Sequence, residues 1–133
     1  MSQPAARQHD PVTAVDTHIV MVPSPGGPVP TPLPHPFAGQ LVENLSGDVL
    51  VNGLPAATVG SVARAIPPHL PTPPGTAFQI PPRNRGTVQA GSGTVLVNGK
   101  AAARQGDTVT TCNDPVDLPV GAVTGGSPTV LVS

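Results

Sequence analysis

The chain has 133 residues, six Lys and Arg against seven Asp and Glu, and a formal net charge of −1. Nucleic-acid binding depends on clustered basic side chains that contact phosphates, so this composition argues against a nucleic-acid partner. No apolar stretch approaches the roughly 20 residues of a membrane-spanning helix, and the first residues lack the basic and apolar regions of a signal peptide. We therefore expect a soluble chain without an export signal.

The composition predicts a thin hydrophobic core. Pro occurs 20 times and Gly 15 times, whereas the only aromatic residues are Phe37 and Phe78. The core must be built from Val, Leu, Ile and Ala, and its stability margin is small unless something else holds the loops. The single cysteine, Cys112, excludes an internal disulfide and leaves a thiol that is inert, reactive or bound to metal.

In chain order, the first segment of interest is residues 4–10, which read Pro-Ala-Ala-Arg-Gln-His-Asp. A Pro-rich stretch runs from Pro23 to Pro36, and a second runs from Pro67 to Pro82. Proline fixes φ and lacks an N–H, so it is unfavourable in a helix or a central strand. We predict that both stretches are extended loops, which at this length are usually functional or tied down.

One hairpin sequence occurs twice around the second stretch. Residues 48–57 read Asp-Val-Leu-Val-Asn-Gly-Leu-Pro-Ala-Ala, and residues 94–103 read Thr-Val-Leu-Val-Asn-Gly-Lys-Ala-Ala-Ala. An Asn-Gly pair favours a type I′ turn because both turn residues need positive φ. The Val-Leu-Val strands are apolar on both faces, as strands buried on both sides are, so one face would be core and the other a docking surface.

The two ends of the chain together make a third copy. Residues 127–132 supply the strand before the turn, and residues 4–10 supply the part that follows it. Internal repeats determine the fold more strongly than local propensity does. We predict a single all-β domain over residues 1–133 with short strands, extensive loops, adjacent termini and approximate three-fold symmetry, which suits a three-fold partner.

Each copy is followed by one possible metal ligand, at eight, eight and five positions after the aligned residues Asp10, Ser61 and Asp107. A fourth candidate lies in the first Pro-rich stretch. The predicted ligands are His18, His35, His69 and Cys112. Three imidazoles and one thiolate complete a tetrahedral set for zinc, and loops related by a pseudo-three-fold axis can converge on it. We predict one structural Zn²⁺ per chain, which would stabilise the thin core.

Other roles are open for these residues. His9 replaces a Gly of the other copies and is interpreted as a turn residue. The remaining histidines could be solvated loop residues, and Cys112 a small buried hydrophobe. A catalytic metal would keep an open position beside a carboxylate base, for which Asp16 and Asp114 are the local candidates. Four candidate ligands favour a closed structural site, so we expect no enzymatic activity.

The Pro-Ala-Ala-Arg sequence at residues 4–7, its relatives at 55–58 and 101–104, and the preceding Val-Leu-Val-Asn-Gly strands resemble the PAAR-repeat family over nearly the whole chain. The resemblance implies a small cone that caps the trimeric VgrG-like spike of a type VI secretion system or another contractile injection system. In described members three His and one Cys hold zinc near the apex, which here implies the four ligands named above.

The resemblance also implies the setting in which the protein acts. One cap would bind each spike trimer, without forming a homo-oligomer, after synthesis in the cytoplasm and assembly on the injection apparatus. It would pierce the target envelope without a transmembrane segment and be delivered outside the producing cell. Relatives often carry toxin domains; none is expected here, so effector proteins would bind separately. The alternatives are a zinc-binding adaptor or effector carrier and a small zinc hydrolase.

Two features depart from the family pattern. Thr58 and Ser61 replace the Arg and Asp of the other copies, so an ion pair made by the repeated Arg and Asp should be missing in the middle copy. The segment from Asp16 to Glu43 is much longer than in compact members. We expect it to enlarge the tip or to contact another molecule.

Overall fold

A closed ring of backbone hydrogen bonds joins the three copies of the repeat. In the computed structural model, which describes residues 2–133, the amide of Ala6 donates to Ala103, that of Ala103 to Ala57, and that of Ala57 to Ala6, at 2.9, 3.0 and 3.0 Å. Each of these is the last alanine of its copy, so equivalent positions bond to one another in a cycle. The predicted pseudo-three-fold symmetry is confirmed.

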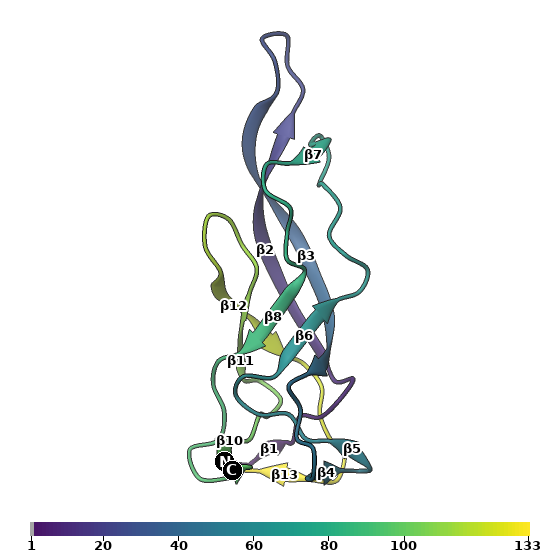
Figure 1. Ribbon diagram of the computed structural model, residues 1–133, viewed down its shortest axis with the longest axis vertical. Helices are drawn as coiled ribbons and strands as arrows, with labels where there is room; N and C mark the ends of the chain where they lie inside the picture. Colours follow the sequence, from purple (N-terminus) through teal and green to yellow (C-terminus); the bar gives the residue numbers. More distant parts are fainter. Residues whose placement is uncertain (1) are drawn as a thin grey trace.

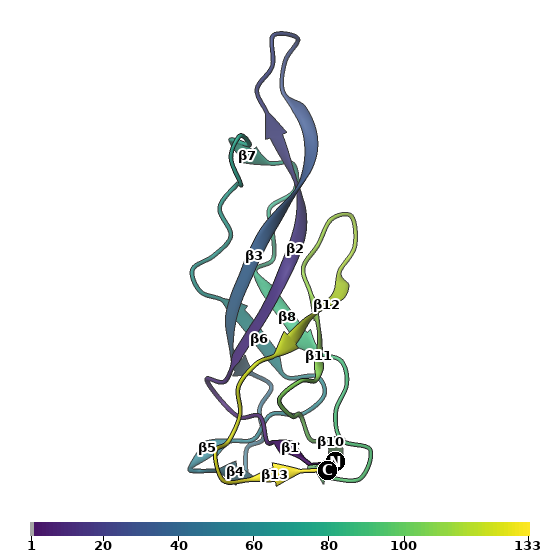
Figure 2. The same ribbon diagram turned by 180° about the vertical axis from the view of Figure 1, so that it is seen from behind.

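Three short antiparallel hairpins form the base of the molecule (Figure 1). Two are continuous, β4–β5 (Leu50–Val51, Leu54–Pro55) and β9–β10 (Leu96–Val97, Lys100–Ala101), and the third pairs β1 (Gln3–Pro4) with β13 (Leu131–Val132). The chain ends therefore lie side by side, as predicted (Figure 2). The Asn52-Gly53 and Asn98-Gly99 turns have positive φ at both residues, as a type I′ turn requires.

A serine that the sequence analysis did not identify fixes the start of each base hairpin. The hydroxyl oxygens of Ser46, Ser92 and Ser127 each accept the backbone amides two and three residues later. Ser127 also donates to Asn52, and Ser46 donates to Asn98, each in the turn of another copy. These bonds interlock the copies at the base.

Above the base, one antiparallel sheet closes on itself. The strand order is β12-β11-β8-β6-β3-β2-β7, and an additional pairing of β12 with β2 closes the ring and leaves β7 outside it. The strands are β2 (Pro11–Val22), β3 (Val29–Glu43), β6 (Val62–Ala65), β7 (Ala77–Phe78), β8 (Arg85–Val88), β11 (Thr108–Thr111) and β12 (Leu118–Val123).

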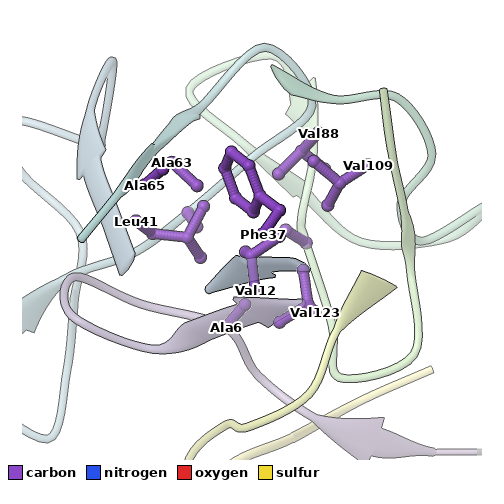
Figure 3. Close-up of a cluster of buried hydrophobic side chains, with 11 residues drawn as sticks. Ala6, Val12, Phe37, Leu41, Ala63, Ala65, Val88, Val109 and Val123 are labelled. Atoms are coloured by element: carbon purple, nitrogen blue, oxygen red, sulfur yellow. The ribbon is translucent and has the colours of Figure 1, made fainter. Parts of the chain in front are cut away.

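The core inside this ring takes residues from equivalent positions of the three copies. The equivalent sets are Ala6, Ala57 and Ala103; Val12, Ala63 and Val109; and Leu41, Val88 and Val123. Phe37 from β3 lies among them and is the one aromatic ring of the cluster (Figure 3). The expectation of a core made from small aliphatic side chains is confirmed.

The longest strand runs through prolines that we expected in a loop. β3 contains Pro30, Pro32, Pro34 and Pro36, and it pairs with β2 from Val29 onwards. Because the prolines occupy alternate positions, their nitrogens face the free edge of the strand, where no neighbouring strand needs a donor. The loop prediction is wrong from residue 29 to residue 36, and β2 and β3, with 12 and 15 residues, are longer than the short strands that we expected for most of the chain.

The β2–β3 hairpin projects beyond the rest of the molecule, so the fold tapers away from the base (Figures 1 and 2). The second Pro-rich stretch is mostly irregular, as expected, but its short strand β7 pairs with β2 at Val20 and Met21. Within residues 2–133, no helix is long and apolar enough to cross a membrane.

Candidate metal centre

The structure gathers the four predicted ligands into one buried cluster. His18 lies on β2, His35 on β3, His69 in the second Pro-rich stretch, and Cys112 directly after β11. The ring centroids of the three histidines are 5.4 Å (His18 to His35), 5.1 Å (His18 to His69) and 5.8 Å (His35 to His69) apart. The repeat alignment therefore located residues that meet in space although they are distant in sequence.

Cys112 contributes a protonated thiol to this cluster. Its Sγ lies 3.7 Å from Nε2 of His18 and 3.5 Å from Oδ2 of Asp16. Burial, followed by the negative charge of Asp16, raises the pKa of the Cys112 thiol to about 11. A thiolate is therefore unfavourable here at neutral pH unless a cation binds beside it.

Asp16 is the member of the cluster that the sequence analysis considered only as a possible base. Its side chain is completely buried, and Oδ2 lies 2.9 Å from Nε2 of His69. The other carboxylate oxygen accepts a hydrogen bond from the hydroxyl of Thr111. Asp16 and His18 are two residues apart on one strand, so both side chains point to the same face.

His35 is a member of this cluster, but both of its ring nitrogens bond to backbone groups. Nδ1 lies 2.9 Å from the carbonyl oxygen of Leu33, and Nε2 accepts the amide of Thr72 at 3.1 Å. The ring also packs on Phe78, with centroids 5.4 Å apart. His35 lies outside the group of donor atoms within 4.8 Å of one another, which comes from Asp16, His18, His69 and Cys112.

The loop after Cys112 holds β2 in place. The amide of Thr17 donates to Asn113 at 2.6 Å, and the amide of Ile19 donates to Asp114 at 2.9 Å. The same Asp114 carboxylate lies 3.4 Å from Nδ1 of His18. Burial lowers the pKa of His18, and Asp114 opposes that change. The ring is therefore a neutral imidazole that could bind a metal through Nε2, while Nδ1 faces the carboxylate of Asp114.

Residues 79–133 match a family model described as the PAAR motif. This match supports the identification of a PAAR-repeat protein. Searches of curated proteins and of solved structures found no significant match. PAAR-motif proteins are structural rather than enzymatic and are associated with the spike tips of type VI secretion systems.

Each Pro-Ala-Ala-Arg-like segment forms a tight turn. The Arg7 and Arg104 amides donate to Asp10 and Asp107, and their guanidinium groups pair with the same carboxylates at 3.4 and 2.9 Å. In the middle copy the hydroxyl of Ser61 accepts the corresponding amide, so the turn persists without the ion pair, as predicted. His9, Gly60 and Gly106 have positive φ at one equivalent position, which confirms His9 as a turn residue.

The donor set of the buried cluster fits a divalent transition metal. One carboxylate, two imidazoles and one thiol offer the O, N and S atoms that zinc takes in proteins. All four side chains are buried, and Nδ1 of His18 makes no hydrogen bond that satisfies it. A buried polar cluster of this kind is costly unless its charges are balanced, which a bound cation would achieve.

Proposed function

We propose that this PAAR-repeat protein caps the trimeric VgrG-like spike of a contractile injection system. The observation that carries the proposal is a three-fold set of exposed leucines on the base. Leu50, Leu96 and Leu131 occupy equivalent positions in the three copies and are 61, 66 and 63 % exposed. Their equal exposure presents one apolar contact to each subunit of a three-fold partner.

The surroundings of these leucines favour an apolar contact. Between the base hairpins lies a hollow of about 290 Å³. Only Ala, Val and Leu side chains from the three copies of the repeat line it. Exposed apolar surface arranged in this way is typical of a protein interface. Covering it would also shield the short base strands, whose free edges otherwise invite unwanted pairing.

A single chain suits the end of a spike better than three chains would. The three copies share one chain, so their outer segments can differ, and only the first copy carries the long β2–β3 hairpin. Three identical chains related by a three-fold axis would carry three such hairpins. We therefore infer one cap per spike trimer, with effector proteins as possible separate passengers.

The far end of the molecule fits passage through an envelope. Residues 17–42 and 65–82, which form the projecting hairpin and the loop beside it, contain no Asp, Glu, Lys or Arg. Charged side chains are the groups most costly to bring into a bilayer. We propose that the cap is made in the cytoplasm, assembled on the apparatus and delivered with this end leading.

The metal centre would serve this role mechanically. A bound Zn²⁺ supplies charge neutralisation and a cross-link, not chemistry on a substrate, because every donor side chain is buried. The chain's own residues hold β2, the second Pro-rich stretch and the end of β11 at one point. Such a cross-link would resist unfolding of the tapered end under thrust.

The test is to mix the purified chain with a trimeric VgrG-like spike and weigh the complex by native mass spectrometry. The proposal predicts one chain per three spike subunits. A complex with three chains per trimer, or no complex at micromolar concentrations, would refute it. A complex that forms only with a third, effector protein would favour the adaptor function instead.

A further inference from the structure

We infer that a pocket between the hairpins β4–β5 and β9–β10 binds the guanidinium group of an arginine side chain from a partner protein. The pocket has a volume of about 430 Å³. Its lining includes Ser46, Asp48, Thr58, Asn98 and Lys100. Binding at this pocket is independent of the proposed docking of the base to a spike.

Another junction between two copies of the repeat shows what occupies the equivalent place. Between the β1–β13 pair and the hairpin β4–β5, Nη1 of Arg7 donates to Oδ1 of Asn52 at 2.8 Å. The same oxygen also accepts the hydroxyl of Ser127. The Arg7 side chain is only 18 % exposed. A guanidinium group is therefore accommodated between two copies, where it donates to the turn asparagine of the neighbouring copy.

The pocket has the same asparagine but lacks the arginine. Oδ1 of Asn98 accepts the hydroxyl of Ser46, which repeats the amide–hydroxyl bond of the other junction. The residue equivalent to Arg7 is Thr58, and its hydroxyl donates to the carbonyl of Val59 at 3.3 Å. Within residues 2–133, Oδ1 of Asn98 has no second donor, although an amide oxygen can accept two hydrogen bonds. One acceptor site in the pocket therefore remains available.

A carboxylate has been added where the arginine is missing. Nδ2 of Asn98 donates to Oδ1 of Asp48 at 2.6 Å, whereas in the other junction Nδ2 of Asn52 donates to the hydroxyl of Thr129 at 2.8 Å. Asp48 makes no ion pair within residues 2–133, and Lys100 lines the pocket without pairing with it. This junction has thus exchanged a cation for an anion.

These groups select a ligand with donors only. The guanidinium group is planar, carries five N–H donors and no acceptor, and can bond to a carboxylate and a neighbouring oxygen at the same time. The ammonium group of lysine is a point charge without this fork geometry. An anionic ligand would be repelled by Asp48. The pocket therefore favours arginine among the side chains that a partner can offer.

Only one of the three junctions has this character, which indicates an asymmetric partner. At the third junction Arg104 is present and pairs with Asp107 at 2.9 Å. A three-fold spike would present the same group to all three junctions, two of which already contain an arginine of this chain. The occupant is therefore a single polypeptide bound beside the cap, as a separate passenger protein would be, and not a spike subunit.

The test is an NMR titration of the isotope-labelled full chain with N-acetyl-arginine amide as the probe. We expect saturable shifts of the backbone amides of Gly47, Asp48 and Lys100, with a Kd in the millimolar range. The citrulline derivative has the same shape without the charge and should cause no saturable shift. The lysine derivative should bind more weakly than the arginine derivative.

Two variants and a control connect the shifts with the pocket. Asp48→Asn retains an acceptor for Asn98 but loses the charge, so it should weaken arginine binding by at least about ten-fold. Thr58→Arg combined with Ser61→Asp rebuilds the arginine of the other copies and should abolish the shifts. Asp117→Asn removes an exposed carboxylate outside the pocket and should leave the Kd unchanged.

Each opposite result overturns the inference. These results are no saturable shift up to about 100 mM probe, an equal response to the citrulline derivative, equal affinity for the lysine derivative, or an unchanged Kd in Asp48→Asn. If the double variant does not fold, Asp48→Asn and the citrulline derivative decide. None of these outcomes affects the proposed cap, because docking to the spike is measured separately.

Discussion

Replacing the exposed base leucines should abolish docking while leaving the fold intact. Fully burying a leucine contributes about 1.5–3 kcal/mol. Since Leu50, Leu96 and Leu131 are 61, 66 and 63 % exposed, docking can still bury about three-fifths of each side chain. Each Leu→Ala substitution should then cost about 1–2 kcal/mol of binding, or about 5- to 30-fold in Kd, and the triple variant about 100-fold or more.

The three Leu→Ala substitutions should weaken binding equally, because the leucines occupy equivalent positions. The three single variants should weaken binding to a trimeric VgrG-like spike by the same factor within about three-fold, measured by biolayer interferometry on the immobilised spike. Leu70→Ala, in the second Pro-rich stretch and 78 % exposed, is the matched control and should bind as the wild type does. Unchanged affinity in the triple variant, or one leucine that carries the whole effect, would refute the reasoning from symmetry.

Three further predictions concern the metal and the repeat. Removing the metal with a chelator, or by Cys112→Ser, should lower the melting temperature by more than about 10 °C. Structural zinc contributes a free energy comparable with the whole stability of a small domain. An unchanged melting temperature would contradict a structural role. The Cys112 thiol of the folded, metal-free chain should resist alkylation at pH 8, because burial raises its pKa to about 11, and should react after unfolding in urea; equal rates measured by mass spectrometry would show that the thiol is not buried. Thr58→Arg combined with Ser61→Asp should restore the missing ion pair and add about 0.5–1 kcal/mol to the free energy of unfolding in urea, and neither single change should be sufficient. The absence of coupling in the double-mutant cycle would contradict an Arg–Asp pair like those of the other two copies.

The repeated segments could be predicted from sequence because their constraints are local. An Asn-Gly pair needs positive φ at both residues, and residues 52–53 and 98–99 have it. The closure of the third copy from the two chain ends followed from repeat alignment alone, and β1 pairs with β13 accordingly. The serines that start each base hairpin were equally periodic, at residues 46, 92 and 127, but their role depends on short polar contacts that the apolar pattern does not display.

The long hairpin could not be predicted by the same reasoning. Proline is excluded from central strands but tolerated at a free edge, and the sequence of residues 29–36 does not indicate that this strand has a free edge. The wrong loop prediction also affected the metal centre, because side chains in a loop do not alternate between two faces as those of a strand do. Once β2 is known to be a strand, Asp16 and His18 share a face and the carboxylate becomes a candidate ligand. The bond from Thr72 to His35 depends on the path of a distant loop and has no local sequence pattern.

The orientation of the chain on the spike shows whether the base is the docking face. We would determine the structure of the complex with a trimeric VgrG-like spike by electron cryomicroscopy. We expect one chain on the three-fold end of the spike, with Leu50, Leu96 and Leu131 against the three subunits and the β2–β3 hairpin pointing away along the axis. Density in which the hairpin contacts the spike, or in which the base leucines face solvent, would contradict it.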